Sequence, residues 1–152
     1  MKDETKLKQA LLEEVRKRGL LSEQEEKTSG GLKEIVSQLL HSRNQTHVFH
    51  LQTDSQSSFA EHSALGGYYD GIVGLIDGLA EAYQGKYDII KSYKNYSLDS
   101  YSSGSQLITY FKALSKKIED VHGKVKDTYI QNQLDTINEL INSTVYKLRF
   151  LK

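Results

Sequence analysis

The sequence predicts an all-α protein, a four-helix bundle with a long crossover and one additional short helix at the N-terminus. Apolar residues recur at three- and four-residue steps through most of the 152-residue chain, which is the period of an α-helix. The chain contains no proline, whereas an average chain of this length contains about seven. The length suits a single domain with one core.

Composition excludes several classes of protein. Without cysteine there is no disulfide scaffold, thiol nucleophile or Cys-ligated metal centre, so any metal ligands must be His, Asp or Glu. The 20 Lys and Arg balance the 20 Asp and Glu, which argues against strong, sequence-independent binding to nucleic acid. The first residues lack the apolar core of a signal peptide and no apolar run reaches about 18 residues, so we expect a soluble, cytoplasmic protein.

Residues 1–28 are predicted to form an amphipathic extension, separate from a bundle at residues 29–152. Apolar residues from Leu7 to Val15 have helical spacing, and the basic run that ends at Gly19 predicts the end of a short helix. Seven basic residues are matched by seven acidic ones in this segment. A solvated face or a protein contact is therefore favoured over DNA binding.

Each of the four bundle helices is predicted from one run of apolar residues. The pair Gly30-Gly31 precedes the first helix, the polar stretch 53–58 separates the first two, and Gly123 ends the third. The expected helices span about residues 32–52, 59–83, 107–121 and 130–151.

A long connector at residues 84–105 lies between the second and third helices. The apolar period fails there, and Ser, Tyr, Asn, Asp and Gly dominate. Connectors of about twenty residues are uncommon in compact domains, but in helix bundles they carry the chain from one end to the other. Two helices, a long crossover and two more helices form the ferritin-like arrangement of the four-helix bundle.

Four side chains on the first two bundle helices are candidate metal ligands: His50, His62, Asp77 and Glu81. Asp77 and Glu81 are four residues apart, so they share one helix face. His62 lies roughly 22 Å from Asp77 along the same helix, and so one chain cannot bring both groups to one ion. Two copies of this helix, antiparallel about a two-fold axis near residues 70–72, would form two equivalent sites. Imidazoles and carboxylates suit iron, zinc or manganese, and an open iron(II) site suits oxygen or peroxide chemistry.

These residues resemble the ferroxidase region of the Dps mini-ferritins, the starved-cell DNA-protection proteins. The likeness rests on two histidines, an aspartate and a glutamate at the family's intervals of 12, 15 and 4 residues, here His50, His62, Asp77 and Glu81. The crossover segment 95–99 and the C-terminal run 147–151 are also similar to the family's sequences. The resemblance covers about residues 32–152.

The resemblance implies a subunit of a hollow dodecamer that binds iron(II) between two-fold-related subunits, oxidises it with peroxide or oxygen and stores the ferric mineral. It also implies that His50 and His62 come from one subunit and that Asp77 and Glu81 come from its mate.

The sequence departs from the family's pattern at two positions near the site. Gly66 stands where a further acidic ligand is expected, and Leu51 stands where a tryptophan usually follows the first histidine. Asp70, one turn after Gly66, or a water molecule would fill the vacant ligand position. His47, one turn before His50, is a candidate auxiliary ligand, although a surface histidine is the favoured interpretation.

Three other interpretations stay open. A non-catalytic helical assembly or interaction protein would keep the bundle without using the metal site. A DNA-condensing protein is disfavoured by the balanced charge. A different metal site would use Glu119 and His122, the Glu-x-x-His step of other ferritin-like carboxylate proteins, but such sites need that step on two helices and the sequence has one. A solvent-facing pair is therefore favoured for these two residues.

Overall fold

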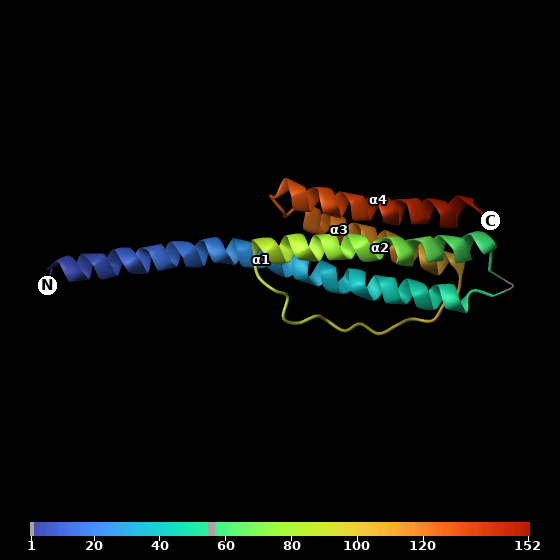
Figure 1. The fold of residues 1–152 in the computed structure, drawn as a ribbon, viewed down its shortest axis with the longest axis horizontal. Coiled ribbons are helices and arrows are strands. Elements are labelled where there is room, and N and C mark those ends of the chain that lie inside the picture. The colour runs from blue at the N-terminus through green and yellow to red at the C-terminus, as the bar shows by residue number, and fades with distance from the viewer. Residues whose placement is uncertain (1, 55–56) are drawn as a thin grey trace.

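The computed structural model describes the backbone of residues 2–54 and 57–152, and the side chains of Lys6, Glu14 and all of these residues from Lys27 onward. Most of this part of the chain forms four helices, α1 (Lys2–Gln52), α2 (Phe59–Lys86), α3 (Gly104–His122) and α4 (Thr128–Phe150). No strand occurs among the described residues. The prediction of an all-α four-helix bundle is confirmed (Figure 1).

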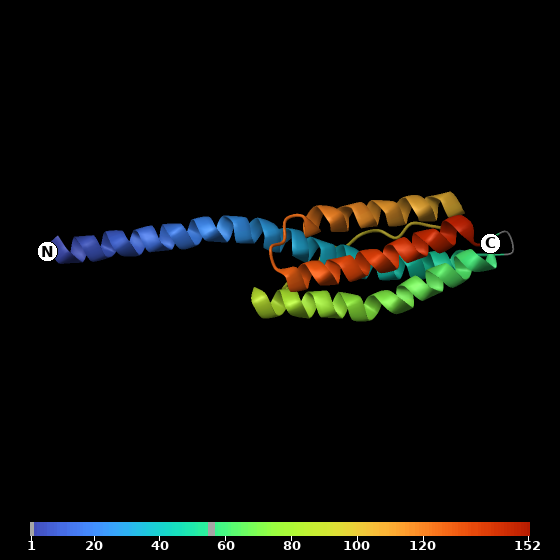
Figure 2. The same ribbon diagram turned by 90° about the horizontal axis from the view of Figure 1, so that it is seen from above.

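Helices that follow each other in the chain are antiparallel, except for α2 and α3. α1 packs against α2, and α4 packs against both α2 and α3 (Figures 1 and 2). The end of α2 lies near the start of the bundle, where the Tyr83 hydroxyl and Ser29 Oγ are 2.5 Å apart. The start of α3 lies at the opposite end, since Gly104 meets Glu61 in the first turn of α2. α2 and α3 therefore run in the same direction, and their connector returns along the length of the bundle.

The core is built from the apolar face of each helix. Aliphatic side chains fill most of it, and tyrosines supply the aromatic bulk that a chain without tryptophan needs. Tyr68 is fully buried, and its hydroxyl lies 2.7 Å from Ser42 Oγ. Burial raises the pKa of Tyr68, so this phenol stays protonated in the core. None of the four helices, over the residues described, combines the length and apolar character needed to cross a bilayer.

The prediction of a separate short helix at the N-terminus is wrong, because α1 is continuous from Lys2 to Gln52. Neither Gly19 nor the Gly30-Gly31 pair interrupts it. A glycine costs about 1 kcal/mol in a helix interior. Good helix formers flank Gly19, and acid–base pairs four residues apart, such as Glu14 and Arg18, favour the helix there. The Gly30-Gly31 pair lies where α1 begins to pack on the bundle, between Ser29 and the fully buried Leu32. Glycine alone was therefore an insufficient signal for a helix end.

Residues 2–28 extend beyond the bundle, and we call them the arm. Both views show this part of α1 projecting away from the other three helices (Figures 1 and 2). Contact with the bundle begins with Ser29 and with Leu32, which is fully buried. Whether the arm and the bundle are separate folding units stays a prediction.

The other helix boundaries lie within three residues of the predicted ones, and a side-chain cap explains the earlier start of α3. Ser58 accepts a hydrogen bond from the Glu61 amide at the start of α2. Ser103 accepts one from the Gln106 amide at the start of α3. Such caps satisfy amides in the first turn of a helix, where the residues are polar and the apolar period gives no signal.

The connector between α2 and α3, residues 87–103, is bound to α1 by hydrogen bonds to its backbone. Ser37 Oγ accepts from the Lys94 amide at 3.2 Å, and His41 Nε2 lies 2.9 Å from the Ser97 carbonyl oxygen. The Gln45 side chain binds the amide and the carbonyl of Asp99 at 2.7 and 2.8 Å. Gln52 Oε1 accepts from the Tyr101 amide at 2.6 Å. In chain order, the four side chains are Ser37, His41, Gln45 and Gln52. The first three are four residues apart and so lie on one face of α1. They provide partners for an extended segment whose backbone would otherwise need water or another strand.

Gln45 makes the most extensive of these contacts. Its buried amide group donates to the Asp99 carbonyl at 2.8 Å and accepts from the Asp99 amide at 2.7 Å. We expect Gln45→Leu to lower the free energy of unfolding by about 2 kcal/mol, because two hydrogen bonds of about 1 kcal/mol each are lost. Urea unfolding of the two proteins measures this. Asn44→Ala, at an exposed position beside it, should change stability by less than about 0.5 kcal/mol. Equal stability of the two variants would show that the connector does not depend on Gln45.

Candidate metal site

His50 and His62 lie side by side where α1 ends and α2 begins. Their ring centroids are 3.8 Å apart, and the ring planes are inclined by 27°. His50 belongs to the last turn of α1 and His62 to the first turns of α2. Both side chains are half-buried. The short link between the helices and their antiparallel packing bring the two rings together within one chain.

Hydrogen bonds fix the same tautomer on both rings. His50 Nδ1 lies 2.9 Å from the His62 carbonyl oxygen, which can only accept, so His50 donates from Nδ1. The Thr53 hydroxyl donates its one hydrogen to the His50 carbonyl at 2.7 Å. The same hydroxyl lies 2.7 Å from His62 Nδ1 and must accept there, so His62 also donates from Nδ1. Each neutral ring therefore carries its lone pair on Nε2, the arrangement typical of histidines that bind metals.

Aromatic rings extend the contact on both sides of this pair. Tyr69 stacks on His47 with centroids 4.3 Å apart and meets the edge of His50 at 5.2 Å. On the other side, Phe59 lies 6.5 Å from His62 and is 81% exposed. The candidate auxiliary ligand His47 is thus packed on a tyrosine ring, 6.3 Å from His50 by ring centroids.

Gly66 makes room for the His50 ring. A Cβ added at Gly66 would lie 3.4 Å from His50 Cε1 and 3.6 Å from His50 Nδ1. A methyl group fits at this distance, but a longer side chain would have to extend past the imidazole. The position where the Dps resemblance leads one to expect a carboxylate is therefore directly against a candidate ligand.

The two carboxylates lie far from the histidines within one chain. Asp77 and Glu81 are exposed on α2, roughly 22 and 28 Å from His62 at 1.5 Å per residue of an unbroken helix. Asp70 is exposed on the same helix. Over the described part of the chain, no group of three or more His, Asp or Glu is close enough to hold a metal ion. The structure brings together His50 and His62 but not the four candidate ligands, and a site between subunits stays a prediction.

The competing pair at the end of α3 has another partner. His122 Nε2 lies 3.2 Å from Asp135 Oδ1 on α4, and Glu119 is exposed. His122 therefore contributes to the contact between α3 and α4.

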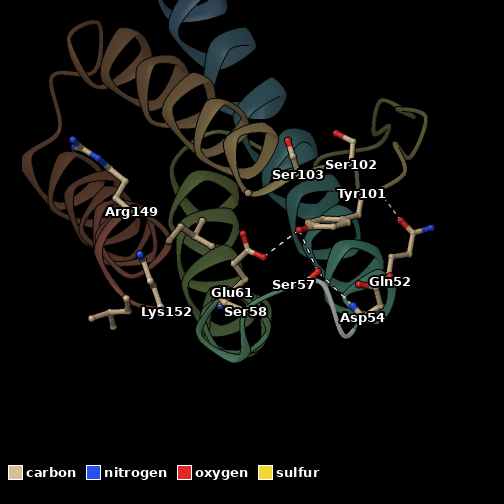
Figure 3. A pocket seen from close by; sticks show the side chains of 13 residues that line it. Gln52, Asp54, Ser57, Ser58, Glu61, Tyr101, Ser102, Ser103, Arg149 and Lys152 are labelled. Atoms are coloured by element: carbon tan, nitrogen blue, oxygen red, sulfur yellow. Dashed lines mark hydrogen bonds between the residues drawn. The ribbon is translucent and has the colours of Figure 1, made fainter.

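A cavity of about 700 Å³ lies at the end of the bundle where α2 and α3 begin (Figure 3). Its lining combines hydroxyls with both signs of charge, and Arg149 and Lys152 from the C-terminal end of α4 face it from the side away from Tyr101. Inside it, the Tyr101 hydroxyl donates to Glu61 at 3.1 Å and accepts from Ser57 at 3.2 Å. Burial is the main cause that raises the pKa of Tyr101.

The sequence analysis did not single out this cavity, because its residues come from separated segments. The one local signal was the step Ser58-x-x-Glu61, which is typical of a capping box. Ser58 does cap α2, but the Glu61 carboxylate turns to Tyr101 and to the start of α3. Gly104 leaves room for this carboxylate, since a Cβ at position 104 would make the end of the Glu61 side chain move. These contacts join the N-terminal ends of α2 and α3 to the last residues of the connector.

Residues 50–148 match the sequence model of a family of unknown function, DUF5856. The chain belongs to this family. The match covers all four candidate ligands, α2, α3 and most of α4. No curated protein and no solved structure matches the chain. Because DUF5856 has no assigned function, membership leaves the iron chemistry a prediction.

The tautomer of His62 depends on the Thr53 hydroxyl, which is a testable feature of this DUF5856 protein. We expect Thr53→Val, which replaces the hydroxyl with a methyl group, to release His62 into a mixture of tautomers, while His50 keeps its Nδ1 hydrogen through the His62 carbonyl. Long-range ¹H–¹⁵N NMR spectra of the imidazoles measure this. Thr53→Ser, which retains the hydroxyl, should preserve both tautomers. An unchanged His62 spectrum in Thr53→Val would show that the hydroxyl does not fix the ring.

Proposed function

We propose that this protein is a Dps-like, ferritin-like iron-binding protein. Iron(II) is its substrate, bound between two subunits, oxidised by peroxide or oxygen and retained as ferric iron inside a dodecameric cage. The observation that carries the proposal is the paired imidazoles of His50 and His62, each with its Nε2 lone pair left available. Histidines that bind metals commonly donate their other ring nitrogen to an oxygen in this way.

The order of the helices supports the ferritin-like part of the proposal. α2 and α3 run in the same direction and are joined by a connector that spans the bundle. One long crossover of this kind distinguishes the ferritin-like bundles from those with short loops throughout.

The outer face of α2 supports a close contact with a second α2. This helix contains six glycines, and each costs about 1 kcal/mol relative to alanine. At Gly67, Gly74 and Gly85 an added Cβ would meet no atom of the same chain within 4 Å. Packing within one subunit therefore does not require glycine at these positions, whereas the backbone of a neighbouring helix approaching closely would.

Exposed apolar side chains lie on α2 and also on α1 and the connector. Eleven large hydrophobic residues are exposed among the described ones. Seven of them belong to α1, α2 or the connector, namely Leu40, Leu51, Phe59, Val73, Ile89, Tyr93 and Leu98. Burial of such residues between subunits would stabilise a dimer.

An antiparallel pair of α2 helices centred near residues 70–72 would bring Asp77 and Glu81 of one subunit to His50 and His62 of the other. Two nitrogen and two carboxylate ligands suit iron(II) and leave coordination positions for the oxidant. Each iron(II) would give up one electron, and peroxide would accept two and be reduced to water. The carboxylates would also balance the charge of the ferric product.

The alternative is a non-catalytic helical assembly that keeps the α2 contact and does not bind iron. Gly66 favours it, because a carboxylate is absent beside His50. The two functions differ in iron binding and not in assembly.

Mixing two defective chains tests whether the site is shared between subunits. We expect His62→Ala, and separately Asp77→Ala combined with Glu81→Ala, to abolish saturable iron(II) binding in anaerobic titrations and to remove the acceleration of iron oxidation by peroxide. A mixed dimer of these chains keeps one intact site, since one chain supplies the imidazoles and the other the carboxylates. Refolding the chains together should therefore recover up to a quarter of the original sites.

Ser63→Ala, at an exposed position beside His62, serves as the matched control and should bind iron normally. No recovery on mixing, with wild-type assembly retained, would contradict a shared site. Wild-type protein that neither binds iron(II) nor accelerates its oxidation would support the non-catalytic assembly.

Restoring a carboxylate beside His50 gives a second test. We expect Gly66→Asp to raise the affinity for iron(II) by about tenfold, because an additional anionic ligand lies next to the imidazole. Gly66→Asn places a side chain of the same size at this position without the negative charge and should leave the affinity unchanged. Anaerobic titration compares the two variants, and equal affinities would argue against iron binding at His50.

A further inference from the structure

The seam by which α1 packs into the bundle continues into the arm in the same register. Positions spaced alternately by three and four residues, a heptad pattern, run along the whole of α1. In the bundle, all six residues at these positions are at most 2% exposed: Leu32, Ile35, Leu39, Ser42, Thr46 and Phe49. In the arm, the same series falls on Glu4, Leu7, Leu11, Glu14, Arg18, Leu21, Glu25 and Thr28.

The arm therefore has a seam without an element of its own bundle to cover it (Figures 1 and 2). Most of the stability of a helix in a protein comes from packing of one of its faces, and leucines on one side of the arm favour association with another helix. The charges near the middle of the seam, Glu14 and Arg18, restrict which helix can bind, because a buried charge needs an opposite charge facing it.

We propose that the arm binds the arm of a second copy of this chain as an antiparallel coiled coil, with the two-fold axis at Arg16. In this arrangement, residues whose numbers add up to 32 face each other. Leu11 then meets Leu21 of the partner, and Glu14 meets Arg18 of the partner. The two-fold axis repeats both contacts, so that four leucines pack together and two opposite-charge pairs form. Nearer the ends of the coiled coil, Leu7 faces Glu25.

Two alternative arrangements bring like charges together. A parallel pair in register places Glu14 on Glu14 and Arg18 on Arg18. An antiparallel pair shifted by one heptad, in which facing numbers add up to 39, places Glu14 on Glu25 and Leu11 on Thr28. Polar residues on a coiled-coil seam are known to select the register in this way, at some loss of stability.

The extent of the overlap agrees with the structure. In the proposed register Glu4 of one arm faces Thr28 of the other, so the pairing ends where Ser29 joins the bundle. The two bundles would lie at opposite ends of the coiled coil and would not collide. The inference goes beyond the proposed function, since it involves neither α2 nor iron.

Cross-linking tests this arrangement in the full-length chain, which has no natural cysteine. We expect mild oxidation of a mixture of Leu11→Cys chains and Leu21→Cys chains to give mostly the mixed disulfide dimer, and Leu11→Cys alone to give little dimer. Mass spectrometry identifies the linked pair. Absence of the mixed dimer, or equal linking by Leu11→Cys alone, would overturn the antiparallel register.

Charge reversal tests the electrostatic basis of the same contact. We expect Arg18→Glu, introduced into both cysteine chains, to lower the yield of mixed dimer about tenfold, and addition of Glu14→Arg in the same chains to restore it. Arg16→Glu makes the same change of charge on the opposite side of the helix and should leave the yield unchanged. A yield that falls equally with Arg16→Glu, or that Glu14→Arg does not restore, would contradict the pairing of Glu14 with Arg18. Circular dichroism of each variant confirms that α1 stays helical.

Discussion

The fixed rise of α2 is the constraint on which the proposed chemistry depends. An unbroken helix keeps His62 roughly 22 Å from Asp77, and bending in solution cannot remove so large a distance. A single chain can therefore hold imidazoles at one place and carboxylates at another, but never all of them around one ion. Any metal chemistry that uses both sets must be coupled to association, so dilution below the dimer dissociation constant would remove activity without unfolding the bundle.

The histidine pair shows how ordinary helix ends can orient candidate ligands. The last carbonyl groups of α1 have no partner within the helix, and the Thr53 hydroxyl satisfies that of His50. The same oxygen then orients His62, and the His62 carbonyl orients His50. The groups that fix the rings are thus part of the turn between two rigid helices. Ligands held in this way lose little entropy on binding an ion.

Apolar periodicity was sufficient to predict the four helices, because burial of one face determines where each helix packs. It failed at Gly19 and at Gly30-Gly31, since local helix formers can offset the cost of a glycine and the sequence does not show that balance. The adjacency of His50 and His62 could be anticipated from a short turn between antiparallel helices. The role of Thr53, the contacts of Gln45 and the cavity around Tyr101 could not, because each depends on hydrogen bonds between segments whose relative position is set only by the folded core.

Two contacts with different symmetry axes on one chain have consequences for assembly. A two-fold contact by itself makes a dimer, but two independent two-fold contacts on each chain make either a closed ring or an open, growing chain. The proposed α2 contact relies on close approach at glycines, whereas the proposed arm contact relies on charged pairs that salt weakens. If both form, the assembly should come apart in two stages. Higher salt would first release the arms and leave α2 dimers, and with them the proposed iron sites, intact.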